Sequence, residues 1–367
     1  MTRTGRAGVG IIGAGNISTQ YLKNLTTFGD VEVRFVADLD VDRAAAQAEA
    51  YGVPRSGTVA ELLADDEIEV VVNLTVPAVH VQVAQQILAA GKHVWSEKPF
   101  ALERESGRAL LAEAQSAGLR VATAPDTFLG AGIQSSLRLI AEGGIGEAHG
   151  ALTLMQSPGP ESWHPNPAFL FDIGAGPLFD IGPYYLTALV QFFGPVTRAQ
   201  AVTSKSRVER VIGSGPLAGQ TFPVNVPTHV AALLEFESGQ SAQSTFSFDS
   251  PLGRTQFEIT GTDATLTVPD PNTFSGDLTL TRAKSDLETR PSEGSAAGRG
   301  TGVVEMVRAI RAGVPERASG ELAFHVLDVM QSIIEAGEGR EPVDVTSTVD
   351  VPPPLEVDWD PAETTLS

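Results

Sequence analysis

The feature that most constrains this chain is a regular alternation of strand and helix patterns over its first 127 residues. It begins with the short apolar run "AGVGII", and each later strand-like run is separated from the next by a helical pattern. The expected strands are 7–12, 31–40, 68–76, 92–97 and 120–125, and the expected helices are 19–28, 41–52, 80–91 and 103–117. Alternation at this spacing predicts right-handed crossovers and one parallel sheet.

The pattern changes near residue 127, where strand-like segments begin to follow one another with few helices between them. These strands are expected at 150–156, 196–203, 229–236, 241–248, 254–260 and 264–268, and two helices at 302–312 and 320–336. They predict an α+β domain with a large, mostly antiparallel open sheet. Since 367 residues are too many for one ordinary core, we expect two domains, 1–127 and 128–367, in an α/β protein.

Composition excludes several classes of function. The net charge of -20 and the lack of a Lys/Arg cluster argue against nucleic acid as a partner. The absence of cysteine excludes disulfides, thiolate zinc sites and a cysteine nucleophile, and we expect no metal site. No apolar run approaches the ~20 residues of a membrane span, and no signal peptide is evident, so we expect a cytoplasmic protein without a membrane partner.

The first strand runs directly into "GAGNIS", a glycine-rich turn that opens a helix. Gly13 allows the tight turn, and Gly15 lets the backbone approach a pyrophosphate placed at the helix N-terminus, beside Asn16 and Ile17. Asp38 ends the next strand, where a carboxylate binds adenosine ribose hydroxyls and repels a 2′-phosphate. The pattern predicts a Rossmann-type dinucleotide site that favours NAD over NADP, with Asp40 as the alternative carboxylate.

Two further strand ends carry candidate cofactor residues. In "NLTVPAVH", Thr75 and Pro77 follow a buried strand and are expected at the cofactor crevice, while His80 suits either a structural role or a cofactor contact. In "HVWSEKPFAL", Glu97 and Lys98 follow another strand at the same edge of the sheet. An ammonium there can orient a substrate hydroxyl and shift the pKa of a nearby acid, although an isolated lysine at a strand end is more often simply solvated.

The second domain contains a glycine-rich helix start, "GAGPLFDIGPYYLTALVQFFG". We expect Pro183 in the first helical turn, which places Asp180 and Tyr184 at i and i+4 on one face. The structural alternatives are an N-cap for Asp180 and packing for Tyr184. Upstream, Trp163 and His164 lie in a loop, 157–172, where a flat indole suits a sugar ring.

Taken together, these segments resemble the glucose–fructose oxidoreductase, inositol dehydrogenase and rhizopine catabolism (Gfo/Idh/MocA) family. The resemblance runs from about residue 7 to about residue 346 and is carried by "GAGNIS", "TVPAVH", "AAGKHVWSEKPFAL", "GAGPLFDIGPYYL", "EITGTDATLTVPDPNTF" and "ELAFHVLDVM". It implies that Lys98 is the catalytic-site lysine and that Asp180 contacts substrate. Many members carry histidine four residues after the aspartate, so the proton-transfer role passes here to Tyr184, with His164 acting through a water as the alternative.

The resemblance implies an NAD-dependent oxidoreductase acting on a secondary alcohol or ketone of a sugar, glycoside or cyclitol. Tyr184 and Lys98 would move the proton, and Asp180, Trp163 and His164 would hold the substrate. A homodimer or homotetramer is expected on the same ground. Two alternatives remain open: an NAD-dependent redox-neutral glycosidase and a non-catalytic dinucleotide-binding sensor.

Overall fold

The computed structural model describes residues 4–366, which form two compact units. The first unit contains residues 1–131, 294–327 and 355–367, and the second contains residues 132–293 and 328–354. The expected division into 1–127 and 128–367 therefore differs for two late segments, 294–327 and 355–367, which belong with the N-terminal part of the chain.

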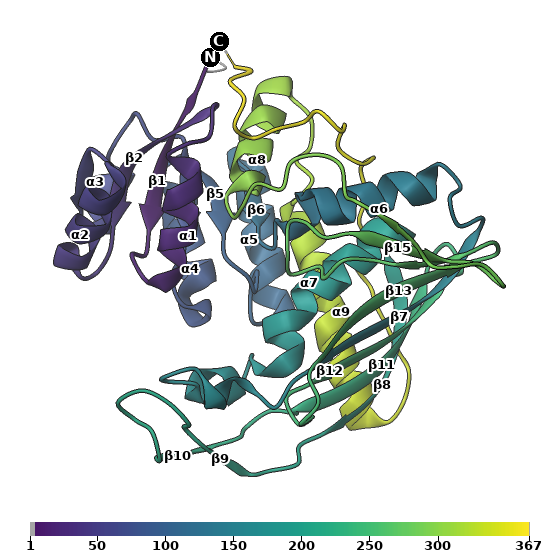
Figure 1. The fold of residues 1–367 in the computed structure, drawn as a ribbon. Helices are drawn as coiled ribbons and strands as arrows, with labels where there is room; N and C mark the ends of the chain where they lie inside the picture. The colour runs from purple at the N-terminus through teal and green to yellow at the C-terminus, as the bar shows by residue number, and fades with distance from the viewer. Residues whose placement is uncertain (1–3, 367) are drawn as a thin grey trace. The chain divides into compact units, whose positions relative to one another are not determined.

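The first unit is built on a six-stranded parallel sheet with the order β3-β2-β1-β4-β5-β6 (Figure 1). Its strands are β1 (Ala7–Ile12), β2 (Val31–Ala37), β3 (Arg55–Gly57), β4 (Val70–Asn73), β5 (His93–Ser96) and β6 (Val121–Thr123). Its helices are α1 (Asn16–Leu25), α2 (Val41–Tyr51), α3 (Val59–Leu63), α4 (His80–Ala89), α5 (Arg104–Ala117) and α8 (Thr301–Ala312), with short 3₁₀ turns at Pro77–Val79 and Thr127–Leu129. The expected parallel sheet is confirmed.

The centre of this sheet is apolar on both faces. Every residue of β1 and β4 is buried, as a parallel strand covered by helices requires. Gly52 and Gly118 end α2 and α5 in the left-handed conformation, with φ of 68° and 66°, which a glycine adopts without the Cβ penalty.

Two buried carboxylates explain why the late segments return to the first unit. Asp30 accepts hydrogen bonds from Arg308 Nε at 2.7 Å and from the backbone N–H of Thr365 and Leu366, both at 2.8 Å. Asp126 accepts from the N–H of Gly300 and Gly302 at the start of α8. Because a buried charge requires such donors, these contacts make residues 294–327 and 355–367 part of the first unit.

The second unit is built on a nine-stranded sheet with the order β16-β15-β14-β13-β7-β12-β11-β8-β17. Neighbouring strands are antiparallel except for β7 and β12, which are parallel, so the expected mostly antiparallel sheet is confirmed. The strands are β7 (Ala148–Gln156), β8 (Val196–Ser204), β11 (His229–Phe236), β12 (Ser241–Ser247), β13 (Arg254–Gly261), β14 (Thr265–Thr267), β15 (Leu278–Thr281), β16 (Glu288–Arg290) and β17 (Val343–Asp344).

Helix α7 (Gly176–Phe193) packs on one face of this sheet, against β11 and β12 (Figure 1). Side chains of β11 and β12 alternate between buried and more exposed positions, so one face of each strand meets the helix. Tyr185 of α7 stacks on Phe257 with ring centroids 6.1 Å apart. The other helices of this part of the chain are α6 (Ala131–Ala141) and α9 (Gly320–Gly339), the latter beginning in the first unit.

A small two-stranded ribbon stands apart from the large sheet. It pairs β9 (Glu209–Val211) with β10 (Thr221–Pro223) in antiparallel register. No strand is expected here from sequence patterns, because each strand has three residues and the connecting turn is rich in glycine. Two 3₁₀ turns, Pro160–Ser162 and Ala168–Phe171, also interrupt the loop 157–172.

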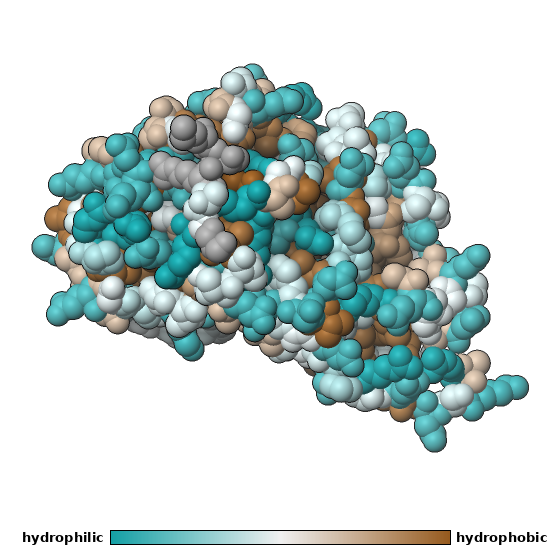
Figure 2. All heavy atoms as spheres, turned by 90° about the horizontal axis from the view of Figure 1, so that it is seen from above, coloured by the Kyte–Doolittle hydropathy of each residue, from teal (hydrophilic) through white to brown (hydrophobic). Residues whose placement is uncertain are grey.

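Hydrophilic side chains predominate on the face shown in Figure 2, and hydrophobic residues form smaller patches among them. Within residues 4–366, no helix combines the length and apolar character that a membrane crossing needs. The same part of the chain contains no group of three or more His, Asp or Glu side chains arranged to hold a metal ion.

Candidate functional site

The turn between β1 and α1 has the geometry of a phosphate-binding loop. Gly13 has a φ of 105°, and a Cβ on it would lie 2.7 Å from the carbonyl oxygen of Leu74. A Cβ on Gly15 would meet no protein atom within 4 Å. No side chain caps α1, which begins at Asn16 and continues through Ile17. The exposed N–H groups of this helix start are suited to an anion.

Asp38 lies directly beside this turn, at the end of β2. Its Oδ2 accepts from Ala14 N–H at 2.7 Å, and its Oδ1 accepts from Asp40 N–H at 2.9 Å and Arg43 Nη2 at 2.7 Å. Burial opposes ionisation of Asp38, but the hydrogen bonds from Arg43, Ala14 and Asp40 outweigh it and lower its pKa. A fixed, ionised carboxylate therefore lies next to the glycine-rich turn.

Asp40, the alternative carboxylate, has a structural role. It is the N-cap of α2 and accepts a hydrogen bond from Arg43 N–H at 3.1 Å. Between the two acids, Leu39 is 98% exposed, which makes it an apolar surface beside Asp38 that the sequence patterns did not single out.

The loop after β4 is organised by a buried asparagine. Asn73 Oδ1 accepts from Thr75 Oγ1 at 2.7 Å, and Asn73 Nδ2 donates to the carbonyl oxygen of His80 at 3.0 Å and to Ser96 Oγ at 3.3 Å. Thr75 and Pro77 remain partly exposed in this loop. Asn73 therefore fixes the position of Thr75, a function that its place at the end of an apolar run did not reveal.

His80 joins two loops at the same sheet edge. It is 1% exposed, and its ring lies between the carbonyl oxygens of Pro99, 2.8 Å from Nδ1, and Thr75, 3.0 Å from Nε2. A neutral imidazole has one N–H and donates to only one of them. Both ring nitrogens face backbone oxygens of the protein, which favours the structural role for His80.

Glu97 anchors the segment that carries Lys98. Tyr21 Oη donates to Glu97 Oε1 at 2.9 Å, Trp95 Nε1 donates to Tyr21 Oη at 3.2 Å, and Lys98 N–H donates to Glu97 Oε2 at 3.1 Å. Tyr21 and Trp95 are fully buried, whereas Lys98 is partly exposed, and the Lys98–Pro99 peptide bond is cis. Glu97 is thus buried support for this turn, and Lys98 is the group that reaches its surface.

Asp126 adds a second buried acid to this cluster. Burial raises its pKa to about 6, and the nearby Glu97 carboxylate acts in the same direction. Burial likewise raises the pKa of Tyr21, with Glu97 and Asp126 adding to the effect. Tyr21 therefore remains a neutral hydrogen-bond donor to Glu97. Nothing in the local sequence around Asp126 marked this role, because its partners at residues 300 and 302 lie far along the chain.

These residues meet at one place in the sheet. Gly13 follows β1 and Thr75 follows β4, and the strand order reverses between β1 and β4. Lys98 follows the adjacent strand β5 at the same carboxyl edge. Open α/β sheets bind ligands at such a switch point. The first unit thus brings together the glycine-rich turn, Asp38, Thr75 and Lys98.

In the second unit, Asp180 and Tyr184 both lie within α7. The helix begins at Gly176 with Pro177 in its first turn, so the expectation that Pro183 occupies the first turn is wrong. Pro183 lies inside the helix, which α7 tolerates while its apolar residues pack on the sheet. Asp180 is consequently too far into the helix to be its N-cap. Asp180 is partly exposed and Tyr184 is 4% exposed.

Trp163 and His164 form an aromatic cluster in the loop 157–172. The indole is 68% exposed and meets the His164 ring edge-on at 5.5 Å, and His164 meets Phe169 in the same way. His164 Nδ1 accepts from Asn166 N–H at 3.1 Å. A neutral His164 therefore carries its proton on Nε2, where it is a hydrogen-bond donor.

Comparison with protein families agrees with this geometry. Residues 7–124 match the model described as "Oxidoreductase family, NAD-binding Rossmann fold", and residues 133–267 match the "GFO/IDH/MocA C-terminal domain". An uncharacterized oxidoreductase of Rhizobium meliloti, ORF334, is 30% identical over 267 residues, covering 71% of this chain and 74% of that protein. The fold and the two family matches, to residues 7–124 and 133–267, define an oxidoreductase with an NAD(P)-binding Rossmann domain. The chain belongs to the Gfo/Idh/MocA family.

Two further relatives have named activities. The dTDP-3,4-didehydro-2,6-dideoxy-alpha-D-glucose 3-reductase of Streptomyces antibioticus is 29% identical over 255 residues, covering 68% of this chain and 74% of that protein. The D-xylose 1-dehydrogenase (NADP(+)) 2 of Haloferax volcanii is 24% identical over 339 residues, covering 90% and 97%.

Solved structures share the fold. An NAD binding oxidoreductase from Klebsiella pneumoniae has a TM-score of 0.82 at 21% identity, covering 93% of this chain and all of that chain. Levoglucosan dehydrogenase in complex with NADH and L-sorbose has a TM-score of 0.78 at 20% identity, covering 94% of this chain and 100% of that chain.

The residues of the first unit fit a dinucleotide. The space at Gly15, where a Cβ would touch nothing, and the uncapped start of α1 suit a pyrophosphate. The carboxylate of Asp38, fixed beside the same turn, suits ribose hydroxyls.

Proposed function

We propose that this chain is an NAD-dependent dehydrogenase for a secondary alcohol or ketone of a sugar, glycoside or cyclitol. The named relatives act on sugar-type substrates, and a reductase and dehydrogenases are both represented among them. The observation that carries the proposal is the turn after β5, where a buried Trp95–Tyr21–Glu97 chain holds the backbone of Lys98 at the carboxyl edge of the sheet.

In this proposal the first unit binds NAD. Gly13 and Gly15 would admit the pyrophosphate at the start of α1, and Asp38 would bind the adenosine ribose. Thr75, Pro77 and Glu97 would line or support the nicotinamide side of the crevice. When bound, NAD supplies the hydride acceptor that oxidises the carbinol carbon of the substrate.

The second unit would hold the substrate and move its proton. Tyr184 would accept the proton of the reacting hydroxyl, and Asp180 would accept a hydrogen bond from a neighbouring hydroxyl. A phenol ordinarily titrates near 10, so the turnover that depends on Tyr184 is expected to rise with pH. Trp163 would offer a flat face to the sugar ring, and the Nε2–H of His164 would donate to a substrate oxygen.

The test is a comparison of Lys98→Ala with Lys23→Ala, a matched change at an exposed lysine of α1. NADH formation and NADH binding are measured separately. We expect Lys98→Ala to lower kcat by at least about 100-fold while the Kd for NADH changes little, and Lys23→Ala to change neither. Near-normal turnover in Lys98→Ala would contradict the proposal. The expected homodimer or homotetramer stays a prediction, checked by light scattering.

A further inference from the structure

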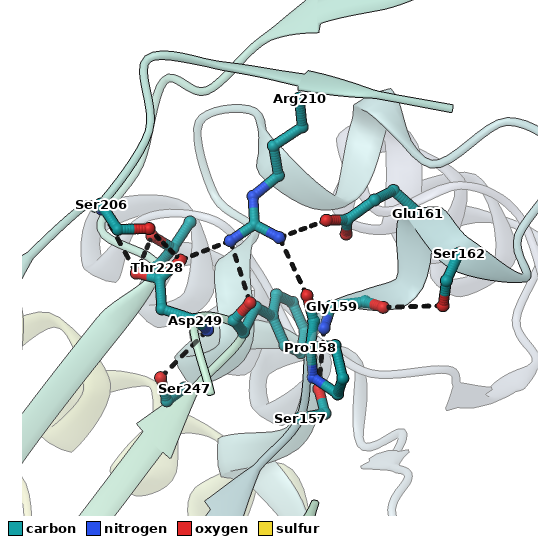
Figure 3. Close-up of polar contacts among 11 residues, drawn as sticks. Ser157, Pro158, Gly159, Glu161, Ser162, Ser206, Arg210, Thr228, Ser247 and Asp249 are labelled. Atoms are coloured by element: carbon teal, nitrogen blue, oxygen red, sulfur yellow. Dashed lines mark hydrogen bonds and ion pairs between the residues drawn. The ribbon is translucent and has the colours of Figure 1, made fainter. Parts of the chain in front are cut away.

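Arg210, in β9, is a buried arginine that joins three separate segments of the second unit. Its Nη1 lies against the carboxylate of Glu161 and donates to the carbonyl oxygen of Pro158 at 3.1 Å. Its Nη2 lies against the carboxylate of Asp249 and donates to the carbonyl oxygen of Phe248 at 2.9 Å. Figure 3 shows the guanidinium between the two acids, one on each side. Arginine is almost never buried without such partners, and Arg210 is 3% exposed.

The acid on the sheet side is itself firmly held. Asp249 Oδ2 accepts from Thr228 Oγ1 at 2.7 Å, and Asp249 Oδ1 accepts from Ser206 Oγ at 2.7 Å. Burial opposes the ionisation of Asp249, but the hydrogen bonds from Thr228 and Ser206 and the charge of Arg210 outweigh it and lower its pKa. Arg210 therefore pairs with an ionised carboxylate, that of Asp249, which is held in place just after β12.

On its other side, Arg210 holds the loop 157–172. The guanidinium lies over the Phe171 ring at 4.9 Å, so it contacts both ends of this loop. A Cβ on Gly159 would lie 2.6 Å from Arg210 Nη1 and 2.3 Å from Glu161 Oε2, which shows how closely the loop surrounds the ion pair. Gly213 N–H, from the turn of the β9–β10 ribbon, also donates to the carbonyl oxygen of Glu161 at 2.7 Å.

Trp163 and His164 follow Glu161 closely in this loop. The N–H groups of Trp163 and His164 donate to the carbonyl oxygen of Pro160 at 3.1 and 2.8 Å, so the backbone turns tightly from Glu161 to the aromatic cluster. Trp163 and Phe169 are 68% and 52% exposed. Such exposed side chains have little packing of their own, and their position depends on the backbone that carries them.

We propose that Arg210 is a positioning residue that determines substrate selectivity through Trp163 and His164. This inference rests on the proposed function, which assigns these two side chains to the sugar substrate. Arg210 does not touch the reacting atoms in this account. It fixes the loop from Glu161 onward, so that the indole face and the His164 Nε2–H are presented in one arrangement.

The experiment compares Arg210→Met and Arg210→Lys with Arg198→Met, which removes an exposed arginine of β8 that is paired with Asp344 of β17 in the nine-stranded sheet. We expect Arg210→Met to raise the substrate KM at least about tenfold with a smaller change in kcat, because misplaced binding groups lose orientation. The Kd for NADH should be unchanged. Arg210→Lys keeps the charge but loses the two-pronged geometry of the guanidinium, so its substrate KM should lie between those of the wild type and Arg210→Met. Arg198→Met should have the substrate KM of the wild type.

A second readout reports the loop directly. The chain has three tryptophans, Trp95, Trp163 and Trp359, and 5-fluorotryptophan gives one ¹⁹F resonance for each, with Trp163→Phe identifying the relevant one. Arg210→Met should move or broaden the Trp163 resonance alone. A folded Arg210→Met variant with an unchanged Trp163 resonance, or with an unchanged substrate KM, would overturn the inference.

Two outcomes need separate provision. Arg210→Met leaves the carboxylates of Glu161 and Asp249 without their guanidinium partner, so if it fails to fold, the neutral combination Glu161→Gln, Arg210→Met and Asp249→Asn replaces it with the same two readouts. If the wild-type chain oxidises no substrate, the proposed function fails. The ¹⁹F spectra then test on their own whether Arg210 positions Trp163. A shifted Trp163 resonance in the Arg210 variant supports this role, and an unchanged resonance overturns it.

Discussion

Replacing Asp38 with asparagine should shift the cofactor preference of this chain toward NADP. Asparagine keeps the shape of the side chain and one oxygen, which can still accept from Ala14 N–H, as Asp38 Oδ2 does at 2.7 Å. The substitution removes the negative charge and the second oxygen. In the wild-type chain that oxygen, Asp38 Oδ1, accepts from Arg43 Nη2 at 2.7 Å. Arg43 is 51% exposed at its side chain, and the change would release its guanidinium.

The size of the effect follows from the charges. A carboxylate about 4 Å from a phosphate is repelled by about 1 kcal/mol at the dielectric of water and by about 4 kcal/mol at the effective dielectric of a protein surface. Asp38 is 7% exposed at the edge of a solvent-facing turn, so a value between these limits applies. The ratio of the two Kd values should therefore change by about five- to a thousandfold, and freed Arg43 adds attraction for a 2′-phosphate.

The assay is titration of the wild-type and variant proteins with NADH and with NADPH, followed by nicotinamide fluorescence. Asp40→Asn is the matched control, because Asp40 is an acid two residues away that caps α2. It should leave the ratio of the two Kd values unchanged. A folded Asp38→Asn variant whose ratio of the two Kd values stays within about twofold of the wild type, a difference of only a few tenths of a kcal/mol, would show that Asp38 does not select the cofactor.

Three further changes test other parts of the account. Tyr184→Phe should lower kcat by about 10² to 10⁴, and Tyr184→His should restore turnover with a pH–rate profile displaced toward the histidine range near 6.5; an unchanged profile would exclude Tyr184 as the base. Asp126→Asn should flatten the pH dependence of the urea midpoint: burial raises the pKa of Asp126 to about 6, so stability of up to about 3 kcal/mol present near pH 4 is lost as the pH rises to 6, and a variant with the wild-type dependence would contradict this. Trp163→Ala should raise the substrate KM about tenfold and leave the Kd for NADH unchanged, and an equal KM would remove Trp163 from the substrate site.

Local patterns were sufficient for much of the fold. The apolar runs at β1 and β4 predicted buried parallel strands because both faces of such strands are covered. The expected helix 41–52 ends on Gly52, and α2 stops at this glycine. Three-residue strands such as β9 and β10 escaped prediction, because too few residues alternate to give a pattern.

The start of α7 shows how a local rule can be applied to the wrong residue. A proline in the first helical turn is favoured, and both Pro177 and Pro183 are candidates in the sequence. The helix begins at Gly176 because Leu178 and Phe179 are buried, at 1% and 8% exposure. Packing of these apolar residues outweighs the cost of Pro183 inside the helix.

The supporting residues of the candidate site depend on contacts that no local pattern encodes. Tyr21 lies in an expected helix, and nothing in the local sequence pairs its hydroxyl with Glu97, 76 residues further along the chain. Asp126 and Arg210 are charged residues in otherwise ordinary segments, and their buried partners lie far along the chain. The return of residues 294–327 to the first unit rests on such long-range pairs as well.

NADH formation from NAD⁺, followed by absorbance across a panel of pyranoses, glycosides and inositols at neutral and alkaline pH, shows whether this chain is a dehydrogenase. The account predicts NADH from at least one member of the panel, with a rate that rises with pH because Tyr184 must ionise. Binding of NAD⁺ without NADH formation at either pH, or release of an aglycone from a glycoside without net NADH, would contradict it.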